Sequence, residues 1–153
     1  MKRILILLAL ATLWSPVAQC LDCGKDIPVT LQDIKACAEL GDAYAQDLLG
    51  MIYFKGKEVP RNYKKGFEWT YKSAQQGYKD AQANLGFDYY NGWGVRKNHV
   101  LAYMWWSLYA VNEKSPLIDQ NLSDLEQELT PDELARAQQM ATDWQLKRQL
   151  KKQ

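Results

Sequence analysis

The sequence predicts an all-α fold, namely an α-solenoid of about two and a half helix-turn-helix repeats followed by C-terminal capping helices. Residues 41–76 and 77–112 align without a gap and agree at 11 of 36 positions. Unrelated segments of this length agree at about two or three positions, so a fixed period of this size indicates a repeat architecture. Apolar residues in each copy follow helical spacing, and no stretch alternates as a strand would. The identical pairs are Gly41/Gly77, Ala45/Ala81, Gln46/Gln82, Leu49/Leu85, Gly50/Gly86, Tyr53/Tyr89, Gly56/Gly92, Val59/Val95, Asn62/Asn98, Trp69/Trp105 and Ala74/Ala110.

Each copy predicts two helices joined by a loop. The front helices are expected at about residues 43–54 and 79–90, and the back helices at residues 63–76 and 99–111. An asparagine precedes each back helix, where its side chain can accept a hydrogen bond from a free N–H group of the first turn. These assignments rest on the apolar positions Ala45, Leu49, Ile52 and Tyr53 and on the two caps, Asn62 and Asn98.

Residues that recur in both copies predict how the helices pack. Gly50 and its counterpart Gly86 lie inside front helices, where glycine costs about 1 kcal/mol relative to alanine at an exposed site. Their recurrence predicts a place where another helix crosses closely. Trp69 and Trp105 share one register and are both expected in the core.

Two other tryptophans have no aromatic counterpart in the first copy. Trp106 aligns with Thr70 and is expected to pack against the C-terminal helices. Trp93 aligns with Lys57 and lies on a loop between two glycines. Exposed tryptophans are enriched in interfaces, and the sequence leaves open whether Trp93 packs or contacts a partner.

The segments on either side of the two copies extend the array. Thr30 can cap a helix over residues 31–40, which aligns with the back half of a repeat. Residues 113–153 are expected to form a helical cap, because a solenoid needs one to cover its open end.

The C-terminal segment contains two predicted helices. The first is expected at residues 117–129 from its leucine spacing. Thr130, followed by proline and then by Glu133, predicts the start of the second through a capping box. Residues 145–153 are polar and basic and are expected to fray.

The first twenty residues are expected to be a secretory signal peptide. Lys2 and Arg3 form a basic start, residues 4–14 are an apolar run of 11, and a Ser-Pro pair ends it. Spanning a bilayer takes about 20 residues, so this run is too short. Cleavage after Cys20 would leave a periplasmic or secreted protein with no membrane span. Lipidation of Cys20 is a weaker alternative, because Gln19 stands where lipoprotein signals carry a small residue, and an uncleaved anchor is the third.

Export would place the cysteines in an oxidising compartment, where thiols pair. Removal of the signal peptide leaves Cys23, in an N-terminal arm of residues 21–29, and Cys37, in the first helix. A disulfide between them would close a 15-residue loop and contribute about 3 kcal/mol in the chain-entropy model. The alternative, a redox pair of Cys20 and Cys23, lacks a strand–helix context.

Composition argues against several kinds of function. Without its two N-terminal basic residues the chain carries 17 basic and 18 acidic residues, whereas nucleic-acid binding needs a basic face. His99 is the single histidine, so no histidine triad or multi-histidine metal site is available, and it is expected at the surface. The loop at Gly92-Trp93-Gly94 lacks the lysine and hydroxyl of a phosphate loop. We therefore expect no enzyme activity, catalytic residue, metal or cofactor.

The shared residues resemble the Sel1-like repeat, a 36-residue helix pair related to tetratricopeptide repeats. The resemblance rests on Ala-x3-Leu-Gly-x2-Tyr-x2-Gly-x2-Val, an asparagine cap, and a tryptophan followed by a small residue before glycine. It covers residues 41–112 strongly and residues 30–40 as a half repeat, and it implies a right-handed solenoid. Glu58 replaces the usual second loop glycine and predicts a differently shaped loop. Glu113 stands where a closing glycine would, so the series is expected to end there.

The resemblance implies non-catalytic binding of another protein along the front helices. In the family's register, this surface combines aromatic and acidic residues of both copies with the loop tryptophan. The residues expected to contact the partner are Tyr44, Asp47, Met51 and Phe54 in the first copy, Asp80, Phe87 and Tyr90 in the second, and Trp93 on the loop.

Exported relatives imply an adaptor role or, more narrowly, an immunity protein that neutralises a periplasmic-acting toxin. Cysteine-rich relatives were proposed to bind or hydrolyse β-lactams, but they carry a cysteine pair in each repeat, which both full repeats lack here. Binding of cell-wall glycans through Trp93 and Tyr90 is the remaining alternative.

Overall fold

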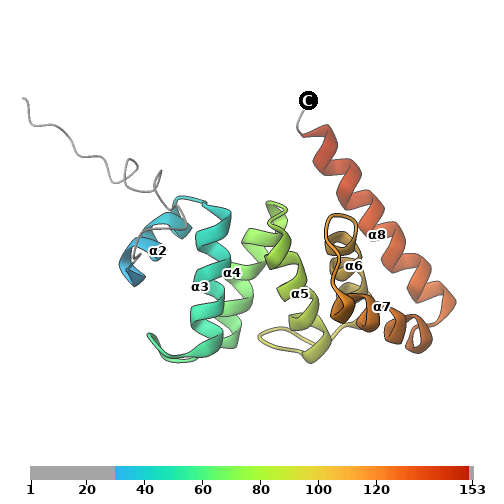
Figure 1. Cartoon of the computed structure of the whole chain (residues 1–153), viewed down its shortest axis with the longest axis horizontal. Helices are drawn as coiled ribbons and strands as arrows, with labels where there is room; N and C mark the ends of the chain where they lie inside the picture. Colours follow the sequence, from blue (N-terminus) through green and yellow to red (C-terminus); the bar gives the residue numbers. More distant parts are fainter. Residues whose placement is uncertain (1–29, 152–153) are drawn as a thin grey trace, which may run out of the picture.

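The computed structural model describes residues 30–151, in which α-helices follow one another and no strand occurs. The helices are stacked in chain order, from α2 at one end of an elongated array to α8 at the other (Figure 1). This arrangement confirms the predicted all-α helical-repeat solenoid. The helices are α2 (Leu31–Glu39), α3 (Ala43–Lys55), α4 (Tyr63–Gln75), α5 (Lys79–Asn91), α6 (His99–Ala110), α7 (Pro116–Glu128) and α8 (Pro131–Leu150).

The helices begin where the sequence places their caps. The Asn62 side chain accepts a hydrogen bond from the Lys65 N–H at 2.9 Å, and Asn98 does the same for Leu101 at 3.0 Å. Thr130 forms the predicted capping box with Glu133 at the start of α8. These bonds satisfy N–H groups that have no partner inside the helix, which explains why the predicted starts are correct.

The two repeats are the helix pairs α3–α4 and α5–α6, with α4 and α5 in contact between them. A methyl group on Gly50 would lie 2.5 Å from Thr70 Oγ1 and 3.1 Å from the Gly66 carbonyl oxygen, both on α4. A methyl group on Gly86 would overlap the Trp106 ring on α6. The predicted close crossings at the two recurring glycines are confirmed.

The two tryptophans that share a register differ in burial. Trp105 is 2% exposed and packs edge-on against Trp144 at 6.0 Å between ring centroids. Trp69 is half-buried at the side of the smaller α2–α3 cluster, and the Lys72 ammonium lies 3.9 Å from its ring centroid. Trp69 therefore packs against a core cluster but is only partly buried, so the prediction that it lies in the core holds in part.

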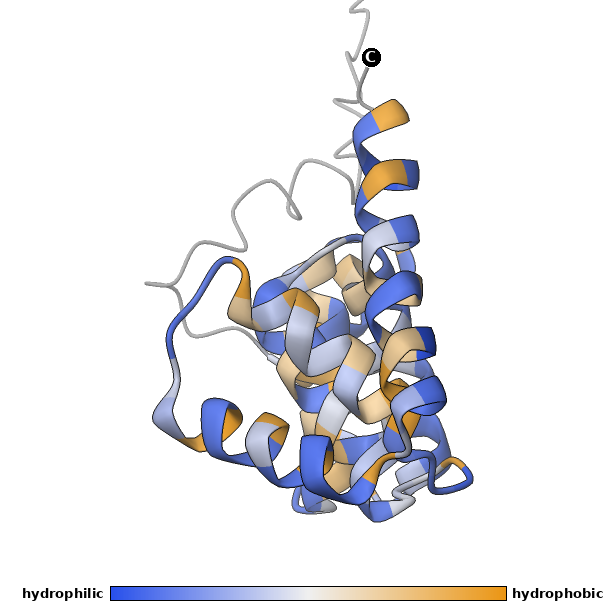
Figure 2. Cartoon of the chain, turned by 90° about the vertical axis from the view of Figure 1, so that its right-hand side faces the viewer, coloured by the Kyte–Doolittle hydropathy of each residue, from blue (hydrophilic) through white to orange (hydrophobic). Residues whose placement is uncertain are grey.

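Helices α7 and α8 both pack on α6. Figure 2 views this end of the array and shows mostly hydrophilic residues along α8, as expected for a helix that covers the end of a core. The expectation that residues 145–153 fray is wrong as far as Leu150, because α8 continues to that residue. Arg148 in this last turn lies over the Trp144 ring at 5.3 Å and helps to hold it.

The expected signal peptide and N-terminal arm lie outside the described residues, and so does Cys23. Cys37, on α2, is 2% exposed. The disulfide between Cys23 and Cys37 therefore stays a prediction.

Candidate functional site

Two adjoining pockets open between the first and second repeats, on the side of the front helices α3 and α5. We call them the aromatic pocket, of about 300 Å³, and the acidic pocket, of about 350 Å³. Met51 and Asn84 line both, so the two pockets form one groove. The aromatic pocket is lined by Met51, Phe54, Thr70, Asn84, Phe87, Asp88 and Trp93. The acidic pocket is lined by Tyr44, Asp47, Met51, Tyr78, Asp80, Ala83, Asn84 and Tyr109.

The aromatic pocket exists because the two repeats differ at one position. In the second repeat, Trp106 is fully buried against α5, where its ring packs edge-on against Phe87 and its Nε1–H donates to the Ala83 carbonyl at 3.1 Å. In the first repeat the same register position holds Thr70, whose side chain is far smaller. The space that an indole fills in one repeat is thus open in the other. Trp106 thus packs on α5, and it belongs to the buried cluster that also contains Ile118 of α7 and Ala141 of α8.

Trp93 forms one wall of the aromatic pocket, on the loop between α5 and α6. Its ring stacks on Tyr63 with 13° between the planes and lies 6.4 Å from Phe54, yet it remains 45% exposed. The loop can approach α4 this closely because Gly94 has φ +72°, and a side chain there would collide with the Tyr63 carbonyl. Glu58, the counterpart of Gly94, lacks a positive φ, so the two loops differ in shape as predicted.

Two aspartates are buried beside the groove. Asp47 is 3% exposed, and its Oδ1 accepts a hydrogen bond from Asn84 Nδ2 at 3.0 Å. Burial raises the pKa of Asp47 to about 6, although this hydrogen bond acts in the opposite direction, and the charge of Asp80 adds to the increase. The carboxyl is therefore expected to release its proton near pH 6 and not near its ordinary pKa of 3.8.

The pKa of Asp88 is raised further than that of Asp47. It is 3% exposed, and within the described part of the chain its Oδ2 has no hydrogen-bond partner. Burial raises the pKa of Asp88 to about 8, with a further contribution from the charge of Asp47. Thr70 Oγ1, on the opposing helix α4, is likewise buried without a described partner. Buried polar atoms are nearly always hydrogen-bonded, so two such atoms lining one pocket indicate a place for a ligand's polar group.

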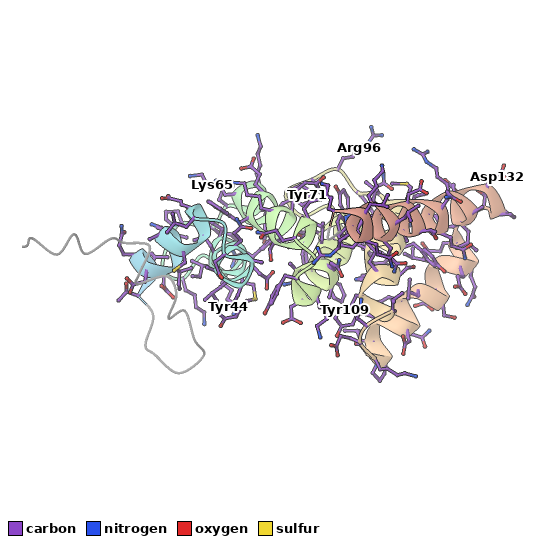
Figure 3. All side chains as sticks on the ribbon, turned by 90° about the horizontal axis from the view of Figure 1, so that it is seen from above. Tyr44, Lys65, Tyr71, Arg96, Tyr109 and Asp132 are labelled. Atoms are coloured by element: carbon purple, nitrogen blue, oxygen red, sulfur yellow. The ribbon has the colours of Figure 1, made fainter. Side chains whose placement is uncertain are left out.

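The acidic pocket continues the groove past Met51. Tyr78 donates a hydrogen bond to Asp80 Oδ2 at 3.1 Å and packs edge-on against Tyr44. Burial, followed by the charge of Asp80, raises the pKa of Tyr78 to about 12, so its hydroxyl remains a donor at any physiological pH. Tyr44 and Tyr109 lie on one side of the array in Figure 3, whereas Tyr71 lies on the opposite side.

The structure brings seven of the eight predicted contact residues together in this groove. Tyr90 does not line either pocket. Its ring is stacked on His99 at 5.1 Å, with Trp106 at 5.5 Å, so its position is one of packing. The residues that line the groove are Tyr44, Asp47, Met51, Phe54, Asp80, Phe87 and Trp93.

Several lining residues were not predicted, above all Asp88, Thr70 and Asn84. A comparison of the two copies contains a signal for them. Asp88 aligns with Ile52 and Thr70 with Trp106, so each is a polar residue where the other copy is apolar. Asn84 aligns with Leu48 in the same way. The other unpredicted lining residues are Tyr78, Ala83 and Tyr109.

His99 does not lie freely at the surface as expected. It is half-buried under Tyr90, with Nδ1 3.0 Å from Glu128 Oε2. Within residues 30–151, no cluster of three or more His, Cys, Asp or Glu side chains is placed to hold a metal. No helix in the same part of the chain combines the length and apolar character needed to cross a membrane.

A further pocket, of about 440 Å³, lies beside α8 near Lys79 and Arg148. Long polar side chains form most of its wall, and it contains none of the described buried atoms that lack a hydrogen-bond partner. The groove between the repeats is therefore the stronger candidate for a binding site.

A helical-repeat array with a groove along its front helices is the architecture of a binding scaffold. The sequence model of the Sel1 repeat matches residues 34–78 and 79–110, which together make up half of the chain. The chain belongs to the Sel1 repeat family. Proteins of this family generally serve as scaffolds for protein–protein interaction.

Among curated proteins, the chain is similar to the chitin synthase regulator SKT5 of Saccharomyces cerevisiae, with 29% identity over 98 residues. It is also similar to the putative sel1-like repeat-containing protein L18 of Acanthamoeba polyphaga mimivirus, with 38% identity over 48 residues. These matches cover 63% and 31% of this chain but only 14% and 8% of the two relatives.

Two solved structures share the fold. The first, c5321, is described as a protective antigen present in uropathogenic Escherichia coli strains displaying an SLR fold, with a TM-score of 0.70 and 29% identity. The second is a Sel1 repeat protein from Oxalobacter formigenes, with a TM-score of 0.59 and 35% identity. They cover 74% and 62% of this chain, which in turn spans 24% and 27% of theirs.

Proposed function

We propose that this protein is an exported, non-catalytic adaptor that binds a segment of another protein in the groove between its two repeats. The observation that carries the proposal is the groove itself, which gathers aromatic and acidic side chains from α3 and α5 beside two buried polar atoms without described partners. Buried polar atoms in this state are costly, and a bound segment would relieve that cost.

The chemistry of the groove favours a polypeptide as the ligand. Phe54, Phe87 and Trp93 offer apolar area, and aromatic side chains of this kind dominate binding energies at protein interfaces. The name of the yeast relative, a chitin synthase regulator, is in keeping with action through another protein. A glycan platform that combines Trp93 with Tyr90 is less favoured, because the Tyr90 ring is packed between His99 and Trp106.

Export rests on the N-terminal sequence pattern, with its basic start and apolar run. An immunity role is the narrower form of the proposal, in which the partner would be a toxin. Intact mass of the protein isolated from the envelope or medium tests both export and the disulfide. We expect a chain that begins at Leu21 and is lighter by two hydrogen atoms than the same chain with both thiols reduced. A chain that begins at Met1 would contradict export.

Affinity capture from the native cell envelope tests the binding proposal. Trp93→Ala removes an exposed wall of the aromatic pocket. Tyr71→Ala is the matched control, because Tyr71 is an aromatic residue of similar exposure and lies on the side opposite Tyr44 and Tyr109 of the acidic pocket (Figure 3). We expect one protein to be retained by the wild type and by Tyr71→Ala but lost by Trp93→Ala. Equal retention by all three, or by none, would contradict binding in the groove. A captured toxin would select the immunity role.

A further inference from the structure

We infer that the aromatic pocket receives an arginine side chain of the protein partner, with Asp88 and Thr70 as its polar contacts. The inference rests on the proposed function of the groove and adds the chemistry of the residue that anchors the partner. It is carried by the polar atoms inside the pocket, the aromatic walls and the charges along the groove.

Two residues in the wall of the pocket each have a buried polar atom without a hydrogen-bond partner among the described residues. Asp88 Oδ2 on α5 and Thr70 Oγ1 on α4 are both buried, and neither has a partner among the described residues. The two side chains are 3% and 1% exposed. A guanidinium group carries five N–H donors in a planar fork and can donate to a carboxylate and to a hydroxyl oxygen at the same time. An apolar side chain would leave both atoms unsatisfied, at the full cost of their burial.

The walls of the pocket suit the flat face of the same group. Phe54, Phe87 and Trp93 line it, and Trp93 is held in place by its stacking on Tyr63. Guanidinium groups stack on aromatic rings and are attracted to their faces, more often than the compact ammonium of lysine. The walls and the polar atoms thus favour arginine over lysine.

The charges along the groove also favour a cation. Asp47, Asp80 and Asp88 line it, and none of the thirteen described lining residues is Lys, Arg or His. Burial is the main reason why the pKa of Asp88 is raised to about 8, and the negative charge of Asp47 adds to the increase. A cation in the pocket would supply the missing interaction for the carboxylate.

The test uses a blocked pentapeptide with one arginine between glycines, added to the protein purified after expression of the full coding sequence. The indole N–H signal of Trp93 in a two-dimensional NMR spectrum reports binding. Two control peptides replace the arginine with citrulline, which has a similar shape without the charge, or with norleucine, which is apolar. We expect saturable shifts with the arginine peptide, and binding weaker by about tenfold or more with either control peptide.

Variants of the protein separate the pocket from the rest of the surface. Asp88→Asn is expected to weaken binding of the arginine peptide by about tenfold or more and to leave the affinity for the norleucine peptide unchanged. Thr70→Trp copies the second repeat and should fill the pocket and abolish binding, with the melting temperature as the check that the variant folds. Tyr71→Ala, on the opposite side, should bind as the wild type does.

Any of three results with the peptides and the variant would overturn the inference, and a fourth concerns arginine alone. They are equal affinity for the arginine and citrulline peptides, equal affinity of wild type and Asp88→Asn, and absence of a saturable shift. A single blocked arginine that binds as tightly as the pentapeptide would also overturn it, because the pocket would then serve a small guanidinium compound. If any of these results occurs while Trp93→Ala still loses a captured protein, the adaptor function stands and only the arginine assignment fails.

Discussion

Replacement of Asp88 by asparagine should change how the stability of this protein depends on pH. The Asp88 carboxyl is 3% exposed, and its pKa is raised from the ordinary value of 3.8 to about 8, chiefly by burial. Asparagine has nearly the same shape but does not ionise. The variant therefore removes one titration and leaves the packing of α5 in place.

The sign follows from proton binding in the two states. Between pH 3.8 and about 8 the folded protein holds a proton on Asp88 that the unfolded chain has released, so the free energy of unfolding falls as the pH rises. This contribution to stability is fully present below pH 3.8, is lost progressively over the window, and stays lost above about pH 8. A fully perturbed group contributes a slope of about 1.4 kcal/mol per pH unit, or on the order of 6 kcal/mol over the whole window.

Urea unfolding at several pH values from 4 to 9 measures this slope for wild type and variant. We subtract the free energy of unfolding of the wild type from that of Asp88→Asn at each pH. This difference should rise with pH across the window and level off near pH 8. Asp47 also has a raised pKa, of about 6, and makes the stability of both proteins depend on pH below that value. Its contribution cancels when the two proteins are compared, so the difference reports Asp88. Asp124→Asn, an exposed position on α7, serves as the control and should follow the wild type. Parallel curves for wild type and Asp88→Asn would refute the reasoning, because Asp88 would then titrate alike in both states.

Three further changes test the packing by denaturant unfolding. Trp105→Ala truncates a side chain that is 2% exposed and should cost about 3–5 kcal/mol, and a cost below about 1 kcal/mol would remove Trp105 from the core. Trp93→Ala, at a ring that is 45% exposed, should cost no more than about 1.5 kcal/mol from lost aromatic contacts, and a larger loss would make Trp93 a core residue. Gly86→Ala puts a methyl group into the Trp106 ring and should cost about 1–3 kcal/mol, whereas an unchanged midpoint would contradict the close crossing.

The helices could be predicted from the sequence because their signals are local. Asn62, Asn98 and Thr130 cap the helices that they were expected to cap, since a capping bond spans only three residues. The recurring pair Gly50 and Gly86 adds a contact between helices, because the same requirement recurs at the same register. Repetition thus makes some tertiary contacts visible in a single sequence.

Burial depends on neighbours that are distant in the chain, and the predictions failed where those neighbours differ between copies. Trp69 and Trp105 share a register, but Trp105 has Trp144 beside it, whereas Trp69 lies at the side of a smaller cluster. Tyr90 has the register of a partner-contacting residue on the front helix, but its ring packs against His99 and Trp106. The periodic pattern fixes the face of a helix and does not show how fully that face is covered.

The sequence predicts the aromatic residues of the candidate site but not the polar residues at its centre. Phe54 and Phe87 were predicted from the register of the front helices, and both line the aromatic pocket. Asp88 and Thr70 were not predicted from that register, although a comparison of the two copies shows each of them as a polar residue where the other copy is apolar. That their buried oxygen atoms have no partner within residues 30–151 becomes apparent only when α4 and α5 are placed face to face.

The space beside Thr70 in the aromatic pocket is where we expect the partner to bind. Affinity capture with Thr70→Trp is the most direct test, because this change copies Trp106 of the second repeat. Gly50 on α3 faces position 70 as Gly86 on α5 faces Trp106. We predict that a Thr70→Trp protein with the melting temperature of the wild type no longer retains the partner, while Tyr71→Ala still does. A folded Thr70→Trp protein that retains the partner as well as the wild type would contradict the claim.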